Sequence, residues 1–296
     1  MKFSLKIVLI IFFTLFVQNS PAQDIYKLWE GEEKPYYKEN DLQEYKKEVW
    51  GDTCVYNVTE PTLTVYNAKG ENSGKAVIIC PGGGYSCEAI YHEGYDIADA
   101  LAQEGITAAV LKYRLPTPKS SNRPHLVPLS DARKALKLLR EKRDEYGFAK
   151  NKVGIIGFSA GGHLANITTL WPSDDPDERP NFSAPIYGVS RPTEENLQWL
   201  GESLYYRELT KAEMAKNNLL DQVSKTTPPV FLVHAQDDTV CNVKESTAYA
   251  QELFKHDVPV EMHIFQKGGH GFGFGHSADG TDKWLELFVN FLKLDI

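Results

Sequence analysis

The chain has 296 residues, of which 42% are hydrophobic and 24% are charged, and its formal net charge is −8. This length suits one large α/β domain and leaves little room for a second. Because the chain is acidic and has no basic run, we expect it to bind neither nucleic acid nor anionic lipid surfaces. A neutral polymer or a small neutral ester suits it better.

Residues 1–22 have the pattern of a secretory signal peptide. Two lysines supply a positive start, Ile7 to Val17 is an uncharged apolar run, and small residues precede a cleavage point after Ala22. The apolar run is shorter than the ~20 residues that a spanning helix needs, so we expect no membrane anchor after cleavage. The pattern predicts an exported, periplasmic or extracellular protein whose mature part, residues 23–296, is a single catalytic domain.

After a polar and aromatic arm at residues 23–50, apolar runs that predict strands alternate with amphipathic stretches that predict helices. The expected strands are residues 62–66, 76–80, 107–113, 153–156, 184–189, 229–234 and 258–265. The expected helices are residues 94–104, 129–146, 160–170, 239–256 and 281–294. This alternation indicates an α/β fold with a mostly parallel sheet covered by helices on both faces. The largest insert is the short polar stretch 171–180, so we expect no large cap domain.

The first motif that carries chemistry is residues 157–161 (GFSAG), which stand between an expected strand and an expected helix. Parallel sheets bind ligands at the carboxyl ends of their strands, where this turn lies. A G-x-S-x-G turn in this setting strains the serine backbone and exposes its hydroxyl, and the helix that follows directs its positive end at a developing oxyanion. The motif predicts Ser159 as a catalytic nucleophile.

A second glycine-rich turn, residues 81–85 (PGGGY), follows the expected strand 76–80. Acyl transfer needs backbone N–H donors around the oxyanion, and glycines let the backbone present them at close range. We assign this role to Gly83 and Gly84, with Ala160 as a third donor.

Neither a cofactor nor a metal is indicated. A dinucleotide-binding loop would need glycine at position 87, where Cys87 stands, and no G-K-[ST] follows the glycines, so a P-loop fails as well. The four cysteines are too few for a disulfide framework, and their spacing matches no zinc pattern.

A serine hydroxyl is a weak nucleophile until a base takes its proton. His270 lies after the last expected strand, between glycines, and is the preferred base, while His276 in the same loop stays open as an alternative. His263 falls within the last strand and His163 on the helix after Ser159, so we expect both to be structural.

The acid that orients the base should follow the expected strand 229–234. Asp237 and Asp238 are both there, and the residues alone leave the two open. Either one gives the chain order serine, acid, histidine, which is the order of α/β-hydrolases.

Taken together, these motifs resemble bacterial α/β-hydrolase carbohydrate esterases, the acetylxylan and feruloyl esterase group whose members are often labelled xylanase. The matching stretches are residues 58–63 (VTEPTL), 81–85 (PGGGY), 111–116 (LKYRLP), 157–164 (GFSAGGHL) and 268–271 (GGHG), and the likeness extends over nearly the whole mature chain. The resemblance implies hydrolysis of acetyl or feruloyl esters on a plant-type carbohydrate, with Asp238 as the acid and His270 as the base. Pro81 and Ala235 depart from the His and Gly common in the group, and neither change removes an assigned group.

Four aromatic residues lie near the expected strand ends or in loops: Tyr85, Trp171, Tyr187 and Phe272. They are candidates to stack on sugar rings or to enclose an acyl group. The alternative is that they close the hydrophobic core, where large aromatics are commonly buried.

Four other functions stay as alternatives. They are a serine peptidase of the prolyl oligopeptidase type, an esterase of small non-carbohydrate esters, a true glycosidase, and a sugar-binding protein without activity. A glycosidase usually needs two carboxylates that flank the bond, and no such pair stands out. A binding protein would normally have lost at least one catalytic part. Nothing in the pattern indicates an oligomeric state.

Overall fold

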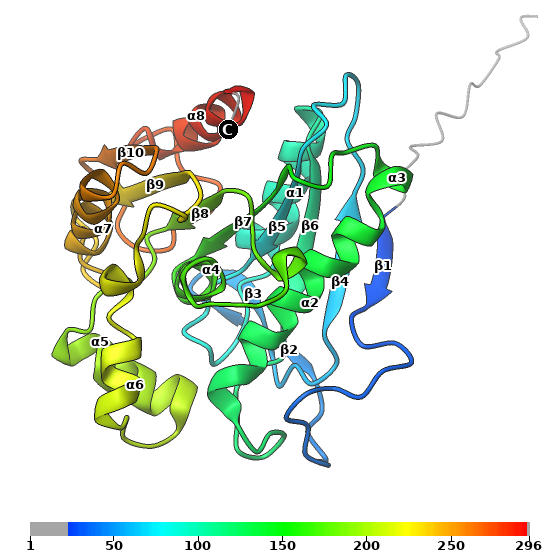
Figure 1. The fold of residues 1–296 in the computed structure, drawn as a ribbon, viewed down its shortest axis with the longest axis vertical. Helices are drawn as coiled ribbons and strands as arrows, with labels where there is room; N and C mark the ends of the chain where they lie inside the picture. The colour runs from blue at the N-terminus through cyan, green and yellow to red at the C-terminus, as the bar shows by residue number, and fades with distance from the viewer. Residues whose placement is uncertain (1–22, 295–296) are drawn as a thin grey trace, which may run out of the picture.

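A computed structural model describes residues 23–294, so the predicted signal peptide lies outside the described residues. The centre of the fold is an eight-stranded sheet in the order β1-β4-β6-β5-β7-β8-β9-β10, and β2 and β3 form a separate antiparallel hairpin (Figure 1). Six neighbouring strands run parallel, in the order β6, β5, β7, β8, β9 and β10. At one edge, β4 pairs antiparallel with β6, and β1 pairs antiparallel with β4. The strand bounds are β1 Asp24–Lys27, β2 Tyr45–Val49, β3 Asp52–Tyr56, β4 Thr62–Tyr66, β5 Ala76–Cys80, β6 Thr107–Lys112, β7 Val153–Phe158, β8 Ser183–Ile186, β9 Val230–Ala235 and β10 Val260–Phe265.

Helices cover the sheet between these strands. In Figure 1, α2 and α4 lie in front of the central strands and α1 lies behind them. The helix bounds are α1 Asp96–Gln103, α2 Val127–Glu141, α3 Arg143–Tyr146, α4 Ala160–Leu170, α5 Glu194–Leu200, α6 Lys211–Lys216, α7 Lys244–Lys255 and α8 Trp284–Lys293. Short π-helical or 3-10 turns are η1 Tyr91–Tyr95, η2 Pro124–Leu126, η3 Pro176–Glu178, η4 Gly201–Tyr205, η5 Leu219–Gln222 and η6 Thr281–Lys283. The predicted α/β fold, a mostly parallel sheet with helices on both faces, is confirmed.

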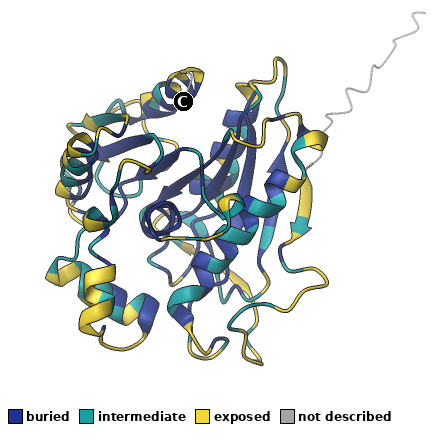
Figure 2. Ribbon diagram, viewed as in Figure 1, coloured by how far each residue is buried: buried dark blue, intermediate teal, exposed yellow. Residues whose placement is uncertain are grey.

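The central strands are buried along their whole length, as Figure 2 shows by their dark colour. Every residue of β5, β7 and β9 is buried. A strand that is covered on both faces needs apolar side chains at consecutive positions, which is why these strands read as continuous apolar runs. The carboxyl ends of β5, β7, β9 and β10 meet at one edge of the sheet, and the loops that follow them carry the site described below.

Several predicted elements differ from the structure at their ends. The expected helix 129–146 is two helices. The first ends at Glu141, because Lys142 leaves helical geometry at φ −88° and ψ 2°. The expected helix 239–256 begins only at Lys244, since Asp238 accepts hydrogen bonds from the N–H groups of Val240 and Cys241 and holds that stretch as a turn. The arm at residues 23–50 also contributes β1 to the edge of the sheet.

The prediction of 171–180 as the largest insert is wrong. Residues 187–229, between β8 and β9, contain α5, η4, α6 and η5 and form a longer helical insertion. None of the residues of α6 is buried, and in α5 only Leu200 is, so neither helix has an apolar stripe that a periodicity search would detect. The insertion is still much smaller than the sheet domain, so the prediction of no large cap holds.

No helix within residues 23–294 is both long and apolar enough to cross a membrane.

Candidate active site

Ser159 lies in the turn between β7 and α4 with φ 52° and ψ −115°, a conformation that L residues rarely adopt. Two glycines make this turn possible. A Cβ on Gly157 would lie 2.0 Å from the carbonyl oxygen of Gly161, and one on Gly161 would lie 2.0 Å from that of Cys80. The tight packing of β5, β7 and α4 therefore forces the serine into a strained turn that presents its hydroxyl at the edge of the sheet.

A continuous chain of hydrogen bonds runs from this serine to a buried carboxylate. His270 Nε2 lies 2.8 Å from Ser159 Oγ, and His270 Nδ1 lies 2.7 Å from Asp238 Oδ2. The other oxygen of Asp238, Oδ1, accepts the backbone N–H groups of Val240 and Cys241, each at 2.8 Å. The carboxylate is thus fixed by its own turn and faces the imidazole on one side.

The structure separates the candidates that the residues alone left open. Asp237 points elsewhere, because its Oδ1 accepts the N–H of Gly269 at 2.8 Å. The backbone N–H of His276 donates to Thr281 Oγ1, so this residue forms part of the turn that leads into η6. His263 pairs with Glu261 on β10. Of the carboxylate and imidazole candidates considered, the geometry brings only Asp238 and His270 together with Ser159.

His163 is buried against the glycine-rich loop 81–85, which we call the oxyanion loop for the role predicted above. Its Nδ1 lies 2.8 Å from the hydroxyl of Tyr85, and burial lowers the pKa of this histidine to about 3. The ring is therefore neutral at physiological pH, which is consistent with a structural role one turn along α4 from the serine.

The loop after β5 lies beside the serine. Gly83 and Gly84 have φ values of 125° and 62°, which favour glycine, and a Cβ on Gly82 would lie 3.0 Å from the Cβ of Ser159. Within residues 23–294, no hydrogen bond is donated by the N–H of Gly83, Gly84 or Ala160. These three N–H groups are therefore unpaired in the part of the chain that the structure describes.

Sequence reasoning missed Glu93, a buried carboxylate in η1 that joins two loops of the site. Its Oε2 accepts the N–H of Gly82 at 2.8 Å, and its Oε1 accepts the hydroxyl of Tyr187 at 2.8 Å. Tyr187 also accepts the N–H of Gly273 in the loop after His270. Burial, with the nearby charge of Glu93, raises the pKa of Tyr187 well above its usual value, so the phenol stays protonated and can donate.

His92, the neighbour of Glu93, ties the hairpin to the same loop. Its Nδ1 lies 2.6 Å from Asp52 Oδ2 at the start of β3, and its Nε2 lies 3.3 Å from the carbonyl oxygen of Gly271. Burial opposes a positive charge on His92, but Glu93 and Asp52 outweigh it and raise the pKa of the ring. No pattern in the sequence marks these two contacts, since they join residues from three separate segments.

The four aromatic residues predicted near the site are all buried: Tyr85 and Tyr187 are 0% exposed, Trp171 is 2% and Phe272 is 3%. At these exposures they present no ring face for a sugar to stack on. Tyr187 instead packs edge-on against the His270 ring, with the ring centroids 5.1 Å apart, and Phe272 packs on Tyr187. Trp171 lies at the far end of α4 and donates to the carbonyl oxygen of Lys216.

A different aromatic residue, Trp199, lies beside the loop after β5. It belongs to α5 in the insertion, is partly exposed, and stacks on Tyr85 with ring centroids 5.6 Å apart. A Cβ on Gly84 would lie 4.0 Å from its indole nitrogen. The insertion therefore places one aromatic wall beside the oxyanion loop.

Such an arrangement is suited to acyl transfer. It combines a partly exposed serine, an imidazole within reach of the serine hydroxyl, a carboxylate behind the imidazole, and unpaired N–H donors. Among the described residues, no group of three or more His, Cys, Asp or Glu side chains gathers as metal ligands would. All four cysteines are buried and unpaired.

Two family models match the chain. The model described as "Prolyl oligopeptidase family" matches residues 126–295, which contain the serine, the carboxylate and the histidine. A second model, described as BD-FAE, matches residues 63–184, which contain the oxyanion loop and the serine.

Two curated relatives match most of the chain. The chain is 32% identical over 229 residues to an acetylxylan esterase of Xylanibacter ruminicola. The alignment covers 75% of this chain and 46% of that protein. It is 27% identical over 248 residues to endo-1,4-beta-xylanase B of Butyrivibrio fibrisolvens, covering 78% of this chain and 38% of that protein. The chain thus spans less than half the length of these two relatives.

A solved structure matches over almost the full length. The acetyl ester-xyloside bifunctional hydrolase of Caldicellulosiruptor lactoaceticus superposes with a TM-score of 0.76 and 29% sequence identity. The match covers 91% of this chain and 95% of that one.

Proposed function

Since the chain belongs to the prolyl oligopeptidase family, whose α/β-hydrolase fold it shares, we propose that it is a serine esterase that removes acetyl or feruloyl groups from a plant-type polysaccharide or oligosaccharide. The observation that carries the proposal is the hydrogen-bonded series Ser159, His270 and Asp238 beside the unpaired N–H groups of the oxyanion loop. The proposal includes export of residues 23–296 after cleavage of the signal peptide.

In the first half of the reaction, His270 Nε2 takes the proton of Ser159 Oγ as that oxygen attacks the ester carbonyl. The carbonyl oxygen becomes an oxyanion, which the N–H groups of Gly83, Gly84 and Ala160 stabilise. Asp238 holds the proton on His270 Nδ1 and stabilises the imidazolium. His270 then returns the proton to the sugar oxygen, which leaves, and the acyl group stays on the serine.

The second half repeats these steps with water. His270 takes a proton from water, the hydroxide attacks the acyl carbon, and the same donors hold the second oxyanion. Return of the proton to Ser159 Oγ releases the carboxylic acid. No cofactor and no metal is needed.

The substrate class is supported by the relatives rather than by the geometry. Two of the proteins described above are named an acetylxylan esterase and an acetyl ester-xyloside bifunctional hydrolase, and the chain is 32% and 29% identical to them. Ser159 directly follows β7 at its carboxyl end, and the described residues form no large cap domain, which suits a polymeric substrate.

A second candidate function is a serine peptidase, which the family match favours. The same groups could cleave a peptide bond, because hydrolysis of an amide needs the same base and the same oxyanion donors as hydrolysis of an ester. Activity on proline-containing peptides without activity on acetylated xylo-oligosaccharides would establish this function instead.

Glycoside hydrolysis is a third candidate, since one of the relatives is named a xylanase. That reaction usually needs a pair of carboxylates on either side of the bond. Asp238 is engaged with His270, so it is not free to act in such a pair. Reducing-sugar release from deacetylated xylan would support this candidate.

The experiment that tests the proposal is a substrate panel read by mass spectrometry. Acetylated and feruloylated xylo-oligosaccharides, their deacylated forms and a proline peptide are incubated with the wild type and with Ser159→Ala. We expect loss of the acyl group only, by the wild type only. An unchanged rate in Ser159→Ala would overturn the mechanism, and cleavage confined to the peptide would overturn the substrate class.

A further inference from the structure

His234, the penultimate residue of β9, is a second histidine in contact with the carboxylate of Asp238. It is fully buried, and its Nε2 lies 3.3 Å from Asp238 Oδ2, the same oxygen that faces His270 at 2.7 Å. Its Nε2 also lies 2.8 Å from the carbonyl oxygen of Cys241, and its Nδ1 lies 2.8 Å from Ser246 Oγ. Both ring nitrogens therefore have partners, as a buried imidazole requires.

These partners determine which nitrogen carries the proton. The two neighbours of Nε2, a carbonyl and a carboxylate, can only accept, so Nε2 carries a hydrogen and donates. In the neutral ring Nδ1 is then an acceptor, and the hydroxyl of Ser246 donates to it. The hydroxyl of Ser246 thus selects the tautomer with a hydrogen on Nε2, which donates to the carbonyl oxygen of Cys241 and lies 3.3 Å from Asp238 Oδ2.

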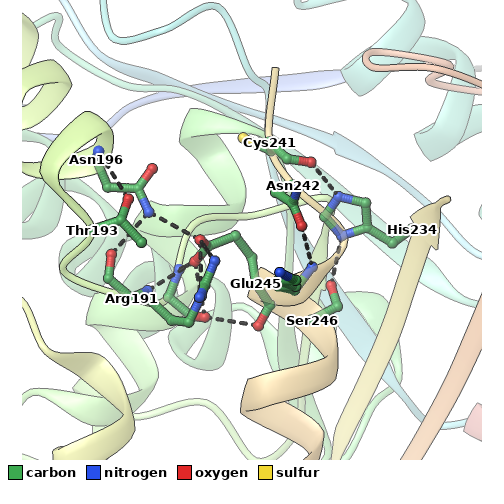
Figure 3. Close-up of polar contacts among 10 residues, drawn as sticks. Arg191, Thr193, Asn196, His234, Cys241, Asn242, Glu245 and Ser246 are labelled. Atoms are coloured by element: carbon green, nitrogen blue, oxygen red, sulfur yellow. Dashed lines mark hydrogen bonds and ion pairs between the residues drawn. The ribbon is translucent and has the colours of Figure 1, made fainter. Parts of the chain in front are cut away.

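Ser246 is itself held in place from the insertion. It lies in the first turn of α7 beside Glu245, which is 2% exposed and accepts hydrogen bonds from Ser190, Arg191 and Asn196 (Figure 3). Figure 3 shows this network and the contacts of the His234 ring side by side at the start of α7. The start of the helix has little freedom to move away from the ring.

We propose that His234 is a positioning residue: its Nε2–H, directed by Ser246, holds the carboxylate of Asp238 against His270 and takes up part of its charge. This inference rests on the proposed function, in which Asp238 is the acid of the triad. Without this donor, one carboxylate oxygen would face His270 alone. Oδ1 would still be held by the N–H groups of Val240 and Cys241, but Oδ2 could shift relative to His270, and more of the carboxylate charge would act on the imidazolium.

The electrostatics of Asp238 agree with this role. Burial opposes ionisation of the carboxyl, but hydrogen bonds from His234 and then from His270 outweigh it and hold the pKa of Asp238 well below its usual range. The carboxylate is therefore charged throughout the neutral range, and the donors around it decide how strongly it stabilises a proton on His270.

Other titratable groups face the two histidines and Asp238. Burial raises the pKa of Tyr187 and of Cys241 well above the usual values, so both are neutral. Asp237 is held by Gly269, and His92 lies against the carbonyl oxygen of Gly271. These groups stay the same when position 234 is changed, so a difference between variants at that position reports its own side chain.

The test compares His234→Leu, which removes the donor, with His234→Gln, whose amide nitrogen can reach the position of Nε2. Ser246→Ala removes the hydroxyl that selects the tautomer. His263→Gln, on the neighbouring strand and away from the triad, is the matched control. Rates of 4-nitrophenyl acetate hydrolysis are measured across pH, because the acid limb of kcat/KM reports protonation of the base.

For His234→Leu we expect kcat to fall about 10- to 100-fold with KM nearly unchanged, since the reacting groups lose their alignment. We expect its acid limb to move to higher pH, because the less neutralised carboxylate favours the imidazolium. His234→Gln should stay within about threefold of the wild type, and Ser246→Ala should fall between the two. The control should match the wild type.

A second readout does not depend on turnover. The ring signals of His270 are titrated by NMR in the Ser159→Ala background, with and without His234→Leu, and the midpoint should rise in the double variant. An unmoved midpoint and acid limb in folded His234→Leu would overturn the inference, and so would a His234→Gln variant as slow as His234→Leu. If position 234 variants do not fold, an unmoved profile in Ser246→Ala would overturn it.

Failure of the proposed function gives a different result. In that case the wild type does not hydrolyse the acetyl ester, while the NMR midpoint still shifts when His234 is changed. If the esterase is active and the midpoint does not shift, only the inference on His234 fails.

Discussion

Glu93 Oε2 accepts the backbone N–H of Gly82 at 2.8 Å, and through this bond a buried carboxylate fixes the loop that carries the proposed oxyanion donors. The other oxygen of Glu93 accepts the phenol of Tyr187, which reaches the loop after His270. One side chain therefore sets the position of the oxyanion loop relative to the base. No direct contact with the substrate is needed for Glu93 to affect the rate.

The first prediction concerns this carboxylate. Glu93→Gln replaces one accepting oxygen by an NH2 group, which would face a donor, so one buried hydrogen bond is lost. We expect kcat on 4-nitrophenyl acetate to fall about 10- to 100-fold with KM nearly unchanged. Glu178→Gln, at a half-buried glutamate of η3 away from the site, is the control and should keep the wild-type rate. Equal rates in the two variants would refute the role of Glu93.

The second prediction separates two adjacent acids. Asp238→Asn keeps the shape of the side chain but removes the charge and the correct acceptor for His270 Nδ1, so kcat should fall by about 10⁴-fold. Asp237→Asn is the matched control and should remain within about tenfold of the wild type, since Asp237 binds only the loop backbone at Gly269 and lies 3.5 Å from Lys267. Steady-state kinetics on one ester decides between them. The reverse order of rates would assign the role to Asp237.

The third prediction concerns strain at Ser159, the proposed nucleophile. Because Ser159 has φ 52° and ψ −115°, a residue without a Cβ should fit the turn better. We expect Ser159→Gly to be more stable than Ser159→Ala, by about 1 kcal/mol, with both variants inactive. Urea denaturation of the two proteins measures this difference. A less stable glycine variant would mean that the turn is not strained.

The fourth prediction uses Glu88, a fully buried glutamate next to the hairpin. Its Oε1 accepts the N–H of Tyr113 at 2.7 Å and its Oε2 has no partner, and burial raises the pKa of the carboxyl well above its usual value. In the unfolded chain the same group loses its proton near pH 4.3. Between those two values only the folded state holds the proton, so its contribution to stability falls as the pH rises.

Glu88→Gln removes this dependence while keeping an oxygen for Tyr113. The melting temperature of the variant minus that of the wild type should therefore increase from pH 5 to pH 8. A difference that is constant with pH, or one that decreases, would show that Glu88 is charged in the folded protein.

Much of the fold could be predicted because buried strands appear in the sequence as runs of consecutive apolar residues. The strands β4 and β5 and the helix α4 coincide with the predicted ranges, since a covered strand needs consecutive apolar residues and the glycines around Ser159 mark the start of α4. The insertion at 187–229 could not be found in this way, because α6 buries no residue and α5 only one. The N-capping residues Thr193 and Thr210 were the available signals.

The site residues also differ in how far they could be predicted, depending on whether their geometry is set locally or by distant segments. Ser159 and the glycine loop are local motifs, so their geometry follows from residues close in sequence. Asp237 and Asp238 are adjacent in a turn, and which of them faces His270 depends on the hydrogen bonds from Val240 and Cys241. The roles of Glu93 and His234 depend on contacts between segments far apart in the chain, for which a single sequence carries no signal.

The measurement that tests the central claim most directly is acetate release from acetylated xylo-oligosaccharides by the wild type and by Ser159→Ala, followed by mass spectrometry of the sugar products. The account predicts that the wild type removes acetyl groups and leaves the glycosidic bonds intact, while Ser159→Ala removes none. Shortened oligosaccharides that keep their acetyl groups, or the same acetate release by both proteins, would contradict it.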